Sequence, residues 1–259
     1  NLNHFRFQYD ALKDYQVYGI DLLGFGASEK PLDAASLGFS IDLFAQQLVD
    51  SIQSRKNESQ PWILAGNSIG GLCCLAVAAR QVVDLEKIVL FNTAGGMTAF
   101  RYSDVPVWAR PVLTFVQCVL LGPLFGPRFF RRFATKSNVQ SILKESGVYC
   151  NTTNVNHELL DLMLEPASDA GAEQVFLAVF AGEPGPTPES LLPNVREPIL
   201  ALWGDSDPWT PVDSGAHPGT LISRYHDNFT LEVVSNTGHC PHDERPDLVN
   251  ARMLEFLRK

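Results

Sequence analysis

The sequence has few cysteines, and their spacing argues against two kinds of site. Only five occur in 259 residues, and none of them forms a C-x-x-C pair. An odd number of irregularly spaced cysteines predicts neither a zinc site nor a disulfide framework. We therefore expect free thiols and no bound metal. The five residues are Cys73, Cys74, Cys118, Cys150 and Cys240.

Long hydrophobic runs and an excess of positive charge are also missing. The longest apolar stretch, 112–125, is interrupted by Gln117, Gly122 and Pro123 and is too short to cross a bilayer. The formal net charge of −9 argues against a nucleic-acid partner and gives no support for electrostatic binding to anionic membranes. We recognise no targeting peptide at the N-terminus. The composition, 45% hydrophobic and 19% charged, predicts a globular domain with an insertion.

Short apolar strands alternate with helices at both ends of the sequence. This alternation is typical of an α/β fold with a mostly parallel sheet and helices on both of its faces. Ligands of such sheets bind at the carboxyl ends of the strands. We expect strands at 17–22, 62–65, 87–91, 198–203 and 229–234, and helices at 1–15, 41–54, 69–80 and 246–257.

Between residues 97 and 188 the strand pattern is absent, and helical patterns broken by prolines replace it. We interpret this stretch as a helical cap inserted into an α/β core made of residues 1–96 and 189–259. The cap is rich in aromatic residues, most of which we expect to pack onto the core and a few to contact a substrate. Three arginines are more typical of a solvated face than of an anion site. The aromatic residues are Trp108, Phe115, Phe125, Phe129, Phe130 and Phe133, and the arginines are Arg128, Arg131 and Arg132.

The stretch Gly66-Asn67-Ser68-Ile69-Gly70 joins a predicted strand to a predicted helix. This G-x-S-x-G pattern is typical of a nucleophile elbow, in which a strained turn exposes a serine hydroxyl. Because such a turn has little room, we expect Gly66 and Gly70 both to be needed for their missing side chains. The Ile69 backbone N–H would be one donor of an oxyanion hole. On the pentapeptide alone, a glycine-rich turn with an incidental serine is an equally good interpretation.

A serine nucleophile needs a base, and the base needs an orienting carboxylate. Asp205 and Asp207 follow one predicted strand, and His239 and His242 follow the last one. We prefer Asp207, which lies farther past its strand and precedes a proline, and His239, which directly follows a glycine. The order Ser68, Asp207, His239 is that of α/β-hydrolases. Such a triad needs no cofactor.

Four motifs carry a resemblance to a known family. The chain resembles the α/β-hydrolase superfamily over its whole length, and within it the pheophytinase and chlorophyll dephytylase branch of plants, algae and cyanobacteria. The motifs are Asp21–Ser28, Gly66–Gly71, Trp203–Thr210 and Gly238–Glu244.

The resemblance implies that Ser68, Asp207 and His239 form the catalytic triad, with Ile69 as an oxyanion donor. It implies hydrolysis of the phytyl ester of pheophytin or chlorophyll, a hydrophobic small-molecule ester, in a chloroplast. We expect contact with a membrane only at its surface, through the cap.

Other activities use the same elbow. Hydrolases of meta-cleavage products, which break a carbon–carbon bond, carry the same G-N-S-x-G-G sequence, although Cys240–Glu244 favours the pigment branch. Epoxide hydrolases and haloalkane dehalogenases are disfavoured, because they have an aspartate in place of Ser68. A general lipid or acyl esterase and a degenerate hydrolase that only binds its ligand are further alternatives.

One departure from the family pattern concerns the N-terminus. Family members normally begin with further strands and a His-Gly loop, whose backbone N–H completes the oxyanion hole. The sequence opens on the helix that should follow this loop. We therefore expect the N-terminal strands to be missing, the activity to be low, and an added upstream segment to raise it.

Overall fold

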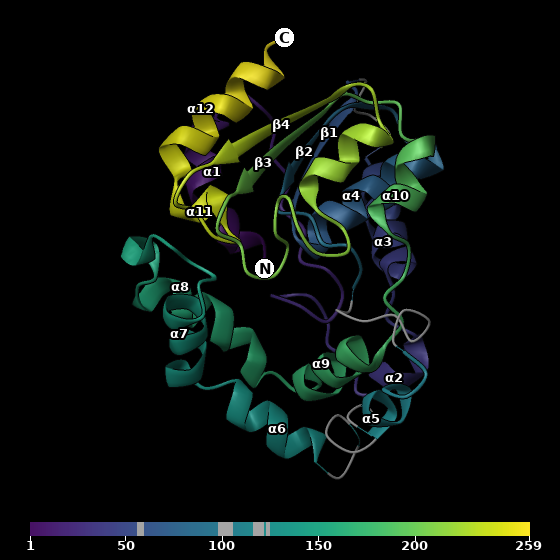
Figure 1. The fold of residues 1–259 in the computed structure, drawn as a ribbon, viewed down its shortest axis with the longest axis vertical. Coiled ribbons are helices and arrows are strands. Elements are labelled where there is room, and N and C mark those ends of the chain that lie inside the picture. The colour runs from purple at the N-terminus through teal and green to yellow at the C-terminus, as the bar shows by residue number, and fades with distance from the viewer. Residues whose placement is uncertain (56–59, 98–105, 116–121, 123–124) are drawn as a thin grey trace.

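The computed structural model describes residues 1–55, 60–97, 106–115, 122 and 125–259 (Figure 1). Four strands form one sheet in the order β1-β2-β3-β4, and every neighbouring pair is parallel. Their apolar sequences are typical of strands covered on both faces. The α/β fold class is thus confirmed. The strands are β1 (Trp62–Asn67), β2 (Leu85–Phe91), β3 (Ile199–Gly204) and β4 (Phe229–Val234).

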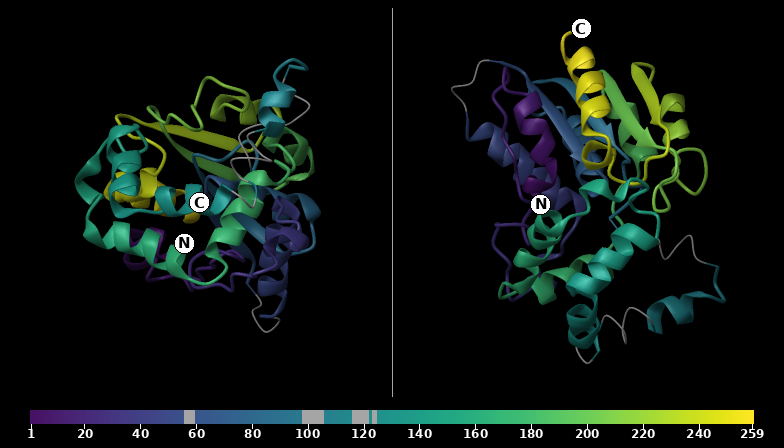
Figure 2. Two further views of the ribbon diagram at one scale, coloured as in Figure 1. Left: turned by 90° about the horizontal axis from the view of Figure 1, so that it is seen from below. Right: turned by 90° about the vertical axis from the view of Figure 1, so that its left-hand side faces the viewer.

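Helices cover both faces of the sheet because its side chains alternate between two hydrophobic clusters. Ile88 and Leu90 of β2 join the cluster under α3 (Ile41–Gln53) and α4 (Ile69–Arg80). On the opposite face, a second cluster contains Val89, Phe91, Leu200 and Leu202, together with Val249 and Met253 of α12 (Pro246–Leu257). The short helix α1 (Arg6–Ala11) lies beside α12 on this face (Figure 2).

Several short helices complete the chain around the sheet. Helix α3 begins after Ser40, whose hydroxyl accepts a hydrogen bond from Leu43 N, as expected of an N-cap. The short helices are η1 (Leu2–Phe5), α2 (Ala34–Leu37), α10 (Pro188–Leu191), η5 (Leu192–Asn194), η6 (Gly219–Arg224) and α11 (Pro241–Glu244).

Four of the five cysteines are described, and all four are free thiols. Cys73, Cys74 and Cys240 are buried and Cys150 is exposed, while Cys118 lies outside the described residues.

The described residues between 97 and 188 form helices and no strand. Figure 1 shows these helices below the sheet, on the side to which the strand arrows point. They therefore lie at the carboxyl ends of the strands. The division of the chain at residues 96 and 189 stays a prediction. The helices are α5 (Arg110–Phe115), α6 (Gly126–Phe133), α7 (Lys136–Glu145), η3 (Thr152–Asn154), α8 (His157–Leu164), η4 (Glu165–Ser168) and α9 (Ala172–Ala181).

The expectation that most cap aromatics pack onto the core is wrong. Trp108 is 80% exposed, and Phe115, Phe125 and Phe129 are exposed as well. Phe130 is buried, but it packs against Phe176 of α9, within the cap. An apolar composition predicts burial on average, and it cannot show on which side of a helix the core lies.

The strand predicted at 17–22 does not form. Among the described residues no strand pairs with this segment, and a strand exists only where a neighbour takes its hydrogen bonds. Instead, the Gln47 side chain binds the backbone there, donating to Asp21 O at 3.1 Å and accepting from Leu23 N at 2.9 Å. The Tyr18 ring packs beside Trp62 of the edge strand β1, with 5.4 Å between ring centroids.

No helix among the described residues has both the length and the hydrophobicity needed to cross a membrane.

Candidate active site

Ser68 lies on a strained turn between β1 and α4. Its backbone has φ 53° and ψ −120°, in a region that residues other than glycine rarely adopt. Such a conformation costs roughly 1–3 kcal/mol and persists only where the surroundings fix it. Ser68 N donates to Phe91 O at 2.9 Å, and Ser68 O accepts from Ala94 N at 3.1 Å. The end of β2 therefore holds the turn in place.

The glycines around Ser68 differ in how much room they have. A Cβ added at Gly66 would lie 2.4 Å from the backbone of Gly70, so this position excludes any side chain. At Gly70 itself an added Cβ meets no described atom within 4 Å, so the expectation that Gly70 is needed for space is wrong. The second crowded position is Gly71, where a Cβ would lie 2.7 Å from Thr93 Oγ1. The crowding arises where α4 packs against β1 and the end of β2.

Asp207 and His239 lie after β3 and β4, and their side chains are hydrogen-bonded. His239 Nδ1 is 2.7 Å from Asp207 Oδ2, and both residues are buried. The carboxylate also accepts hydrogen bonds from the Asn92 amide (2.6 Å), the Thr210 hydroxyl and Trp209 N (2.8 Å). Burial raises the pKa of Asp207, but the bonds from His239, Thr210 and Trp209 and the charge of His239 together lower it to about 2. The buried carboxylate is thus ionised at neutral pH.

Backbone contacts connect the turn at Ser68 with the loop that carries His239. The Asn67 side chain donates to His239 O at 3.0 Å and to Phe91 O at 3.1 Å. The Trp209 ring is more than half exposed and packs edge to face against the His239 ring, with 5.0 Å between the ring centroids. The ends of β1, β3 and β4 therefore meet at one edge of the sheet, where the sequence predicted the site.

Asp205 and His242, the other candidates, have different surroundings. Asp205 is exposed and closes the turn, accepting hydrogen bonds from Ser206 Oγ at 2.8 Å and Thr237 N at 3.3 Å. His242 is fully buried, stacked on the Phe5 ring, and within the described residues neither of its ring nitrogens has a hydrogen-bond partner. Burial lowers its pKa well below the usual range. Both therefore suit structural roles.

Sequence reasoning missed two side chains that hold this site together. Asn92, after β2, also accepts from Gly204 N at 3.0 Å and so ties β2 to β3 beside Asp207. Glu244 is buried and accepts from three backbone N–H groups, those of Gly238 (2.8 Å), Cys150 (2.8 Å) and Asn151 (3.0 Å). The only available signals were the positions of Asn92 at a strand end and of Glu244 within the motif around His239.

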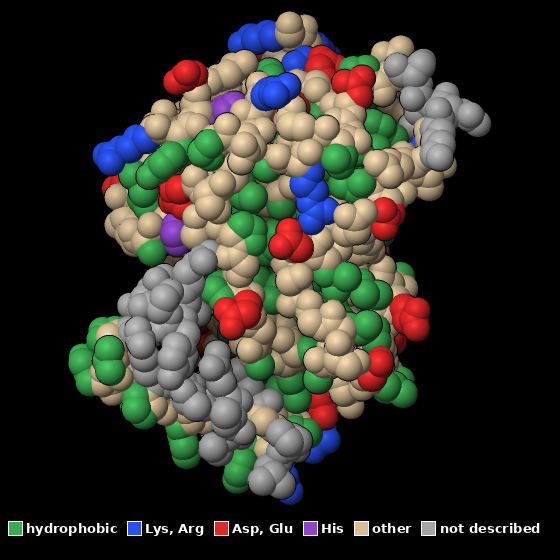
Figure 3. All heavy atoms as spheres, turned by 90° about the vertical axis from the view of Figure 1, so that its right-hand side faces the viewer, with side chains coloured by type: hydrophobic (Ala, Val, Ile, Leu, Met, Phe, Trp, Pro, Cys, Tyr) green, Lys and Arg blue, Asp and Glu red, His purple; other side chains and the backbone are tan. Residues whose placement is uncertain are grey.

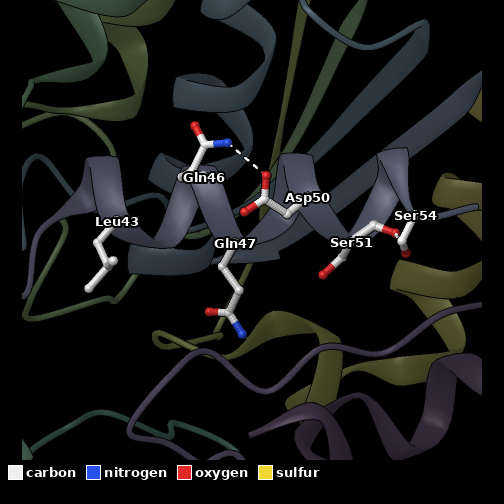
Figure 4. Close-up of a pocket in the computed structure, with 6 residues that line it drawn as sticks. All are labelled: Leu43, Gln46, Gln47, Asp50, Ser51 and Ser54. Atoms are coloured by element: carbon white, nitrogen blue, oxygen red, sulfur yellow. Dashed lines mark hydrogen bonds between the residues drawn. The ribbon is translucent and has the colours of Figure 1, made fainter.

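Metal ligands and surface hollows are two further features by which the described residues could mark a site. Within the described part of the chain, no group of three His, Cys, Asp or Glu side chains could hold a metal ion. A surface hollow of about 420 Å³ lies along α3, and the residues that line it do not include Ser68, Asp207 or His239 (Figure 4). Its lining residues are Leu43, Gln46, Gln47, Asp50, Ser51 and Ser54.

Comparison with known proteins gives one family match. Residues 3–252 match the model of the alpha/beta hydrolase family. The 2-hydroxymuconate semialdehyde hydrolase of Pseudomonas sp. (strain CF600) is 35% identical over 259 residues, which cover 96% of this chain and 78% of that protein. The chloroplastic pheophytinase of Arabidopsis thaliana is 24% identical over 96% of this chain, but only 57% of that protein is covered.

The fold is shared with solved structures. A serine hydrolase involved in carbazole degradation, the CarC enzyme, superimposes with a TM-score of 0.75 at 19% identity. The match covers 100% of this chain and 86% of that one.

Proposed function

This chain belongs to the alpha/beta hydrolase family, as a serine hydrolase, and we propose that it cleaves a carbon–carbon bond. The bond lies next to a carbonyl group, and the reaction runs through Ser68, His239 and Asp207. The observation that carries this choice of bond is the 35% identity to 2-hydroxymuconate semialdehyde hydrolase. The buried hydrogen bond between His239 and Asp207 supports the assignment of the triad.

In the proposed reaction, Ser68 Oγ attacks the substrate carbonyl and His239 takes up its proton. The ionised Asp207 fixes the ring through Nδ1 and stabilises the positive charge that forms on it. The Ile69 backbone N–H, at the start of α4, donates to the oxyanion. The bond to the leaving carbon then breaks, His239 returns the proton to that carbon, and water hydrolyses the acyl-enzyme to a carboxylic acid.

The second candidate is hydrolysis of a phytyl ester of a chlorophyll-type pigment, by the same triad. It is favoured by the match to pheophytinase and by the motif Gly238–Glu244. The leaving group would then be the alcohol phytol in place of a carbon. This activity would place the protein in a chloroplast.

One experiment separates these candidates. The protein and its Ser68→Ala variant are incubated with 2-hydroxymuconate semialdehyde, with pheophytin a and with chlorophyll a, and the products are separated by chromatography. Cleavage of the semialdehyde alone supports the carbon–carbon hydrolase, whereas release of phytol supports the esterase. Equal turnover by Ser68→Ala would overturn the proposed mechanism.

Labelling with a fluorophosphonate covers the remaining outcomes. If Ser68 is labelled but none of the three substrates is cleaved, both proposed substrates are wrong, and simple acyl esters are tested next. If Ser68 is not labelled and pigment binds without turnover, the chain is a degenerate hydrolase that acts as a binding protein.

A further inference from the structure

The outer side of the cap exposes large hydrophobic side chains over a short stretch of sequence. Trp108 is 80% exposed and Phe115 is 60% exposed. Single exposed hydrophobic residues are normal, but a group of them marks an interaction site. We call this group the apolar tip. It consists of Val107, Trp108, Val112, Phe115, Phe125 and Phe129.

The apolar tip lies at one end of the molecule. Figure 1 shows α5 and α6 at the end opposite the C-terminus, and Figure 3 shows hydrophobic side chains projecting along this cap half. Phe125 precedes α6 as its N-cap, and Phe129 follows one turn later. Both are exposed, although the Phe129 ring also contacts the rings of Phe133 and Phe176. Phe130, in contrast, is buried. A flat surface could therefore meet α5 and α6 without meeting the core.

Positive charge is concentrated in the stretch of sequence that contains the apolar tip. Residues 105–144 contain six of the 20 Lys and Arg residues and none of the 29 Asp and Glu residues. The rest of the chain keeps 14 basic and 29 acidic residues, a formal net charge of −15. The overall charge of −9 therefore hides a basic segment, and it does not exclude a negatively charged partner for this segment.

Part of this charge is available at the surface. Arg131 and Lys136 are paired with Glu173 and Asp161, in contacts that are exposed to solvent. Arg132 is exposed on α6, and no acidic side chain of the described residues lies within ion-pair distance of it. Arg132 and Phe129 are three positions apart and so lie on the same face of the helix.

We propose that the apolar tip and the basic residues of α6 form a docking surface for an anionic lipid membrane. Aromatic side chains that enter the interface, next to arginines that meet lipid phosphates, are the two components that such binding requires. An anionic membrane repels the remaining chain, so only this end faces it. A second copy of the chain fits less well, because a symmetric dimer would bring two basic faces together.

The proposal is tested with vesicles of phosphatidylcholine alone and of phosphatidylcholine with 30% phosphatidylglycerol. We expect the protein to sediment with the anionic vesicles only, and to be released when NaCl is raised from 0.1 to 0.5 M. The double variant W108A/F129A should lower the partition coefficient about tenfold or more, because two aromatic side chains that would move from water into the lipid interface are removed. Arg132→Glu should lower it by a similar factor.

Two matched controls lie outside the cap, at the last residue of η6 (Arg224) and at its C-cap (Tyr225). Tyr225→Ala removes an aromatic ring that is 45% exposed, compared with 42% for Phe129, and Arg224→Glu makes the same charge change as Arg132→Glu. Both controls should bind vesicles like the unmodified protein. Circular dichroism and the melting temperature check that all variants are folded.

Several results would overturn the proposal. These are the absence of binding to anionic vesicles, equal binding to neutral and anionic vesicles, and equal losses in the η6 controls and the cap variants. A dimer in light scattering that the cap variants dissolve would identify the surface as a self-interface and would also overturn it. Since no substrate is used, the outcome is independent of the proposed reaction.

Discussion

Substitution of Asn92 by aspartate tests whether the surroundings of Asp207 control the reactivity of Ser68. Asn92 Nδ2 donates to Asp207 Oδ2 at 2.6 Å, while its Oδ1 accepts from Gly204 N. Asn92→Asp keeps the shape and the second bond, and aspartate tolerates the residue's φ of 40°. Two carboxylates at this distance cannot both be ionised, so the pair retains a proton.

The expected loss follows from the replaced donor, because the Asn92 amide stabilises the full charge of Asp207, whereas the shared proton of the variant spreads that charge over two carboxyl groups. A hydrogen bond to a charged group contributes about 1.5–3 kcal/mol, so the reaction at Ser68 should slow by about 10- to 100-fold if the transition state loses this amount. The shared proton should also move the acidic limb of the pH profile upward, because the pKa of Asp207 no longer lies near 2.

The assay is the second-order rate constant for labelling of Ser68 by a fluorophosphonate, measured from pH 5 to 9. Asn236→Asp is the matched control, because Asn236 also follows a strand with a positive φ but is exposed. It should label like the unmodified protein. A folded Asn92→Asp variant with an unchanged rate and an unshifted profile would refute the reasoning.

Three further predictions concern stability. Gly66→Ala should lower the free energy of unfolding by about 1–3 kcal/mol, because the added Cβ meets the Gly70 backbone. Gly70→Ala should change it by less than about 1 kcal/mol. Thermal unfolding of the two variants checks this. The folded-state pKa of Asp207, about 2, lies below its ordinary value of 3.8, so its contribution of about 2 kcal/mol is present above pH 4 and is lost as pH falls from 4 to 2. Urea unfolding of the protein and of Asp207→Asn should therefore differ most above pH 4, and a constant difference would contradict this. Glu244→Gln should cost about 1–3 kcal/mol, because at least one of three backbone N–H groups loses its acceptor. Faster amide hydrogen exchange at Gly238, Cys150 or Asn151 would support this, with the exposed Glu145→Gln as control.

Local patterns predicted most of the strands and helices of the core. The apolar run before Ser68 and the helix after it are encoded within a few residues, and α4 and β4 have the predicted bounds. The run at 17–22 has the same local character but forms no strand, because strand formation depends on a neighbour that is distant in sequence. Local pattern alone does not contain that information.

The candidate site divides in the same way. Asp207 and His239 follow strand ends, and parallel strands bring such residues to one edge, so their hydrogen bond was predictable from order alone, while the action of Ser68 with them stays a prediction. The partners Asn92 and Glu244 were not. Glu244 accepts from backbone N–H groups of Cys150 and Asn151, and every residue other than proline offers such a group. No residue type could therefore have indicated these contacts.

The contacts between Val148–Asn151 and the loop around His239 have a consequence for hybrid proteins. His239 N donates to Val148 O at 2.8 Å, and Glu244 binds Cys150 and Asn151. In mechanical terms, this short stretch belongs to the core although the sequence assigns it to the cap. A chimaera that exchanges residues 97–188 as one block would replace these contacts to the His239 loop with residues from another protein. The exchange is better made in two pieces that leave 147–151 in place. The grafted helices then bring a new surface, while the hydrogen bonds between 148–151 and the His239 loop are kept.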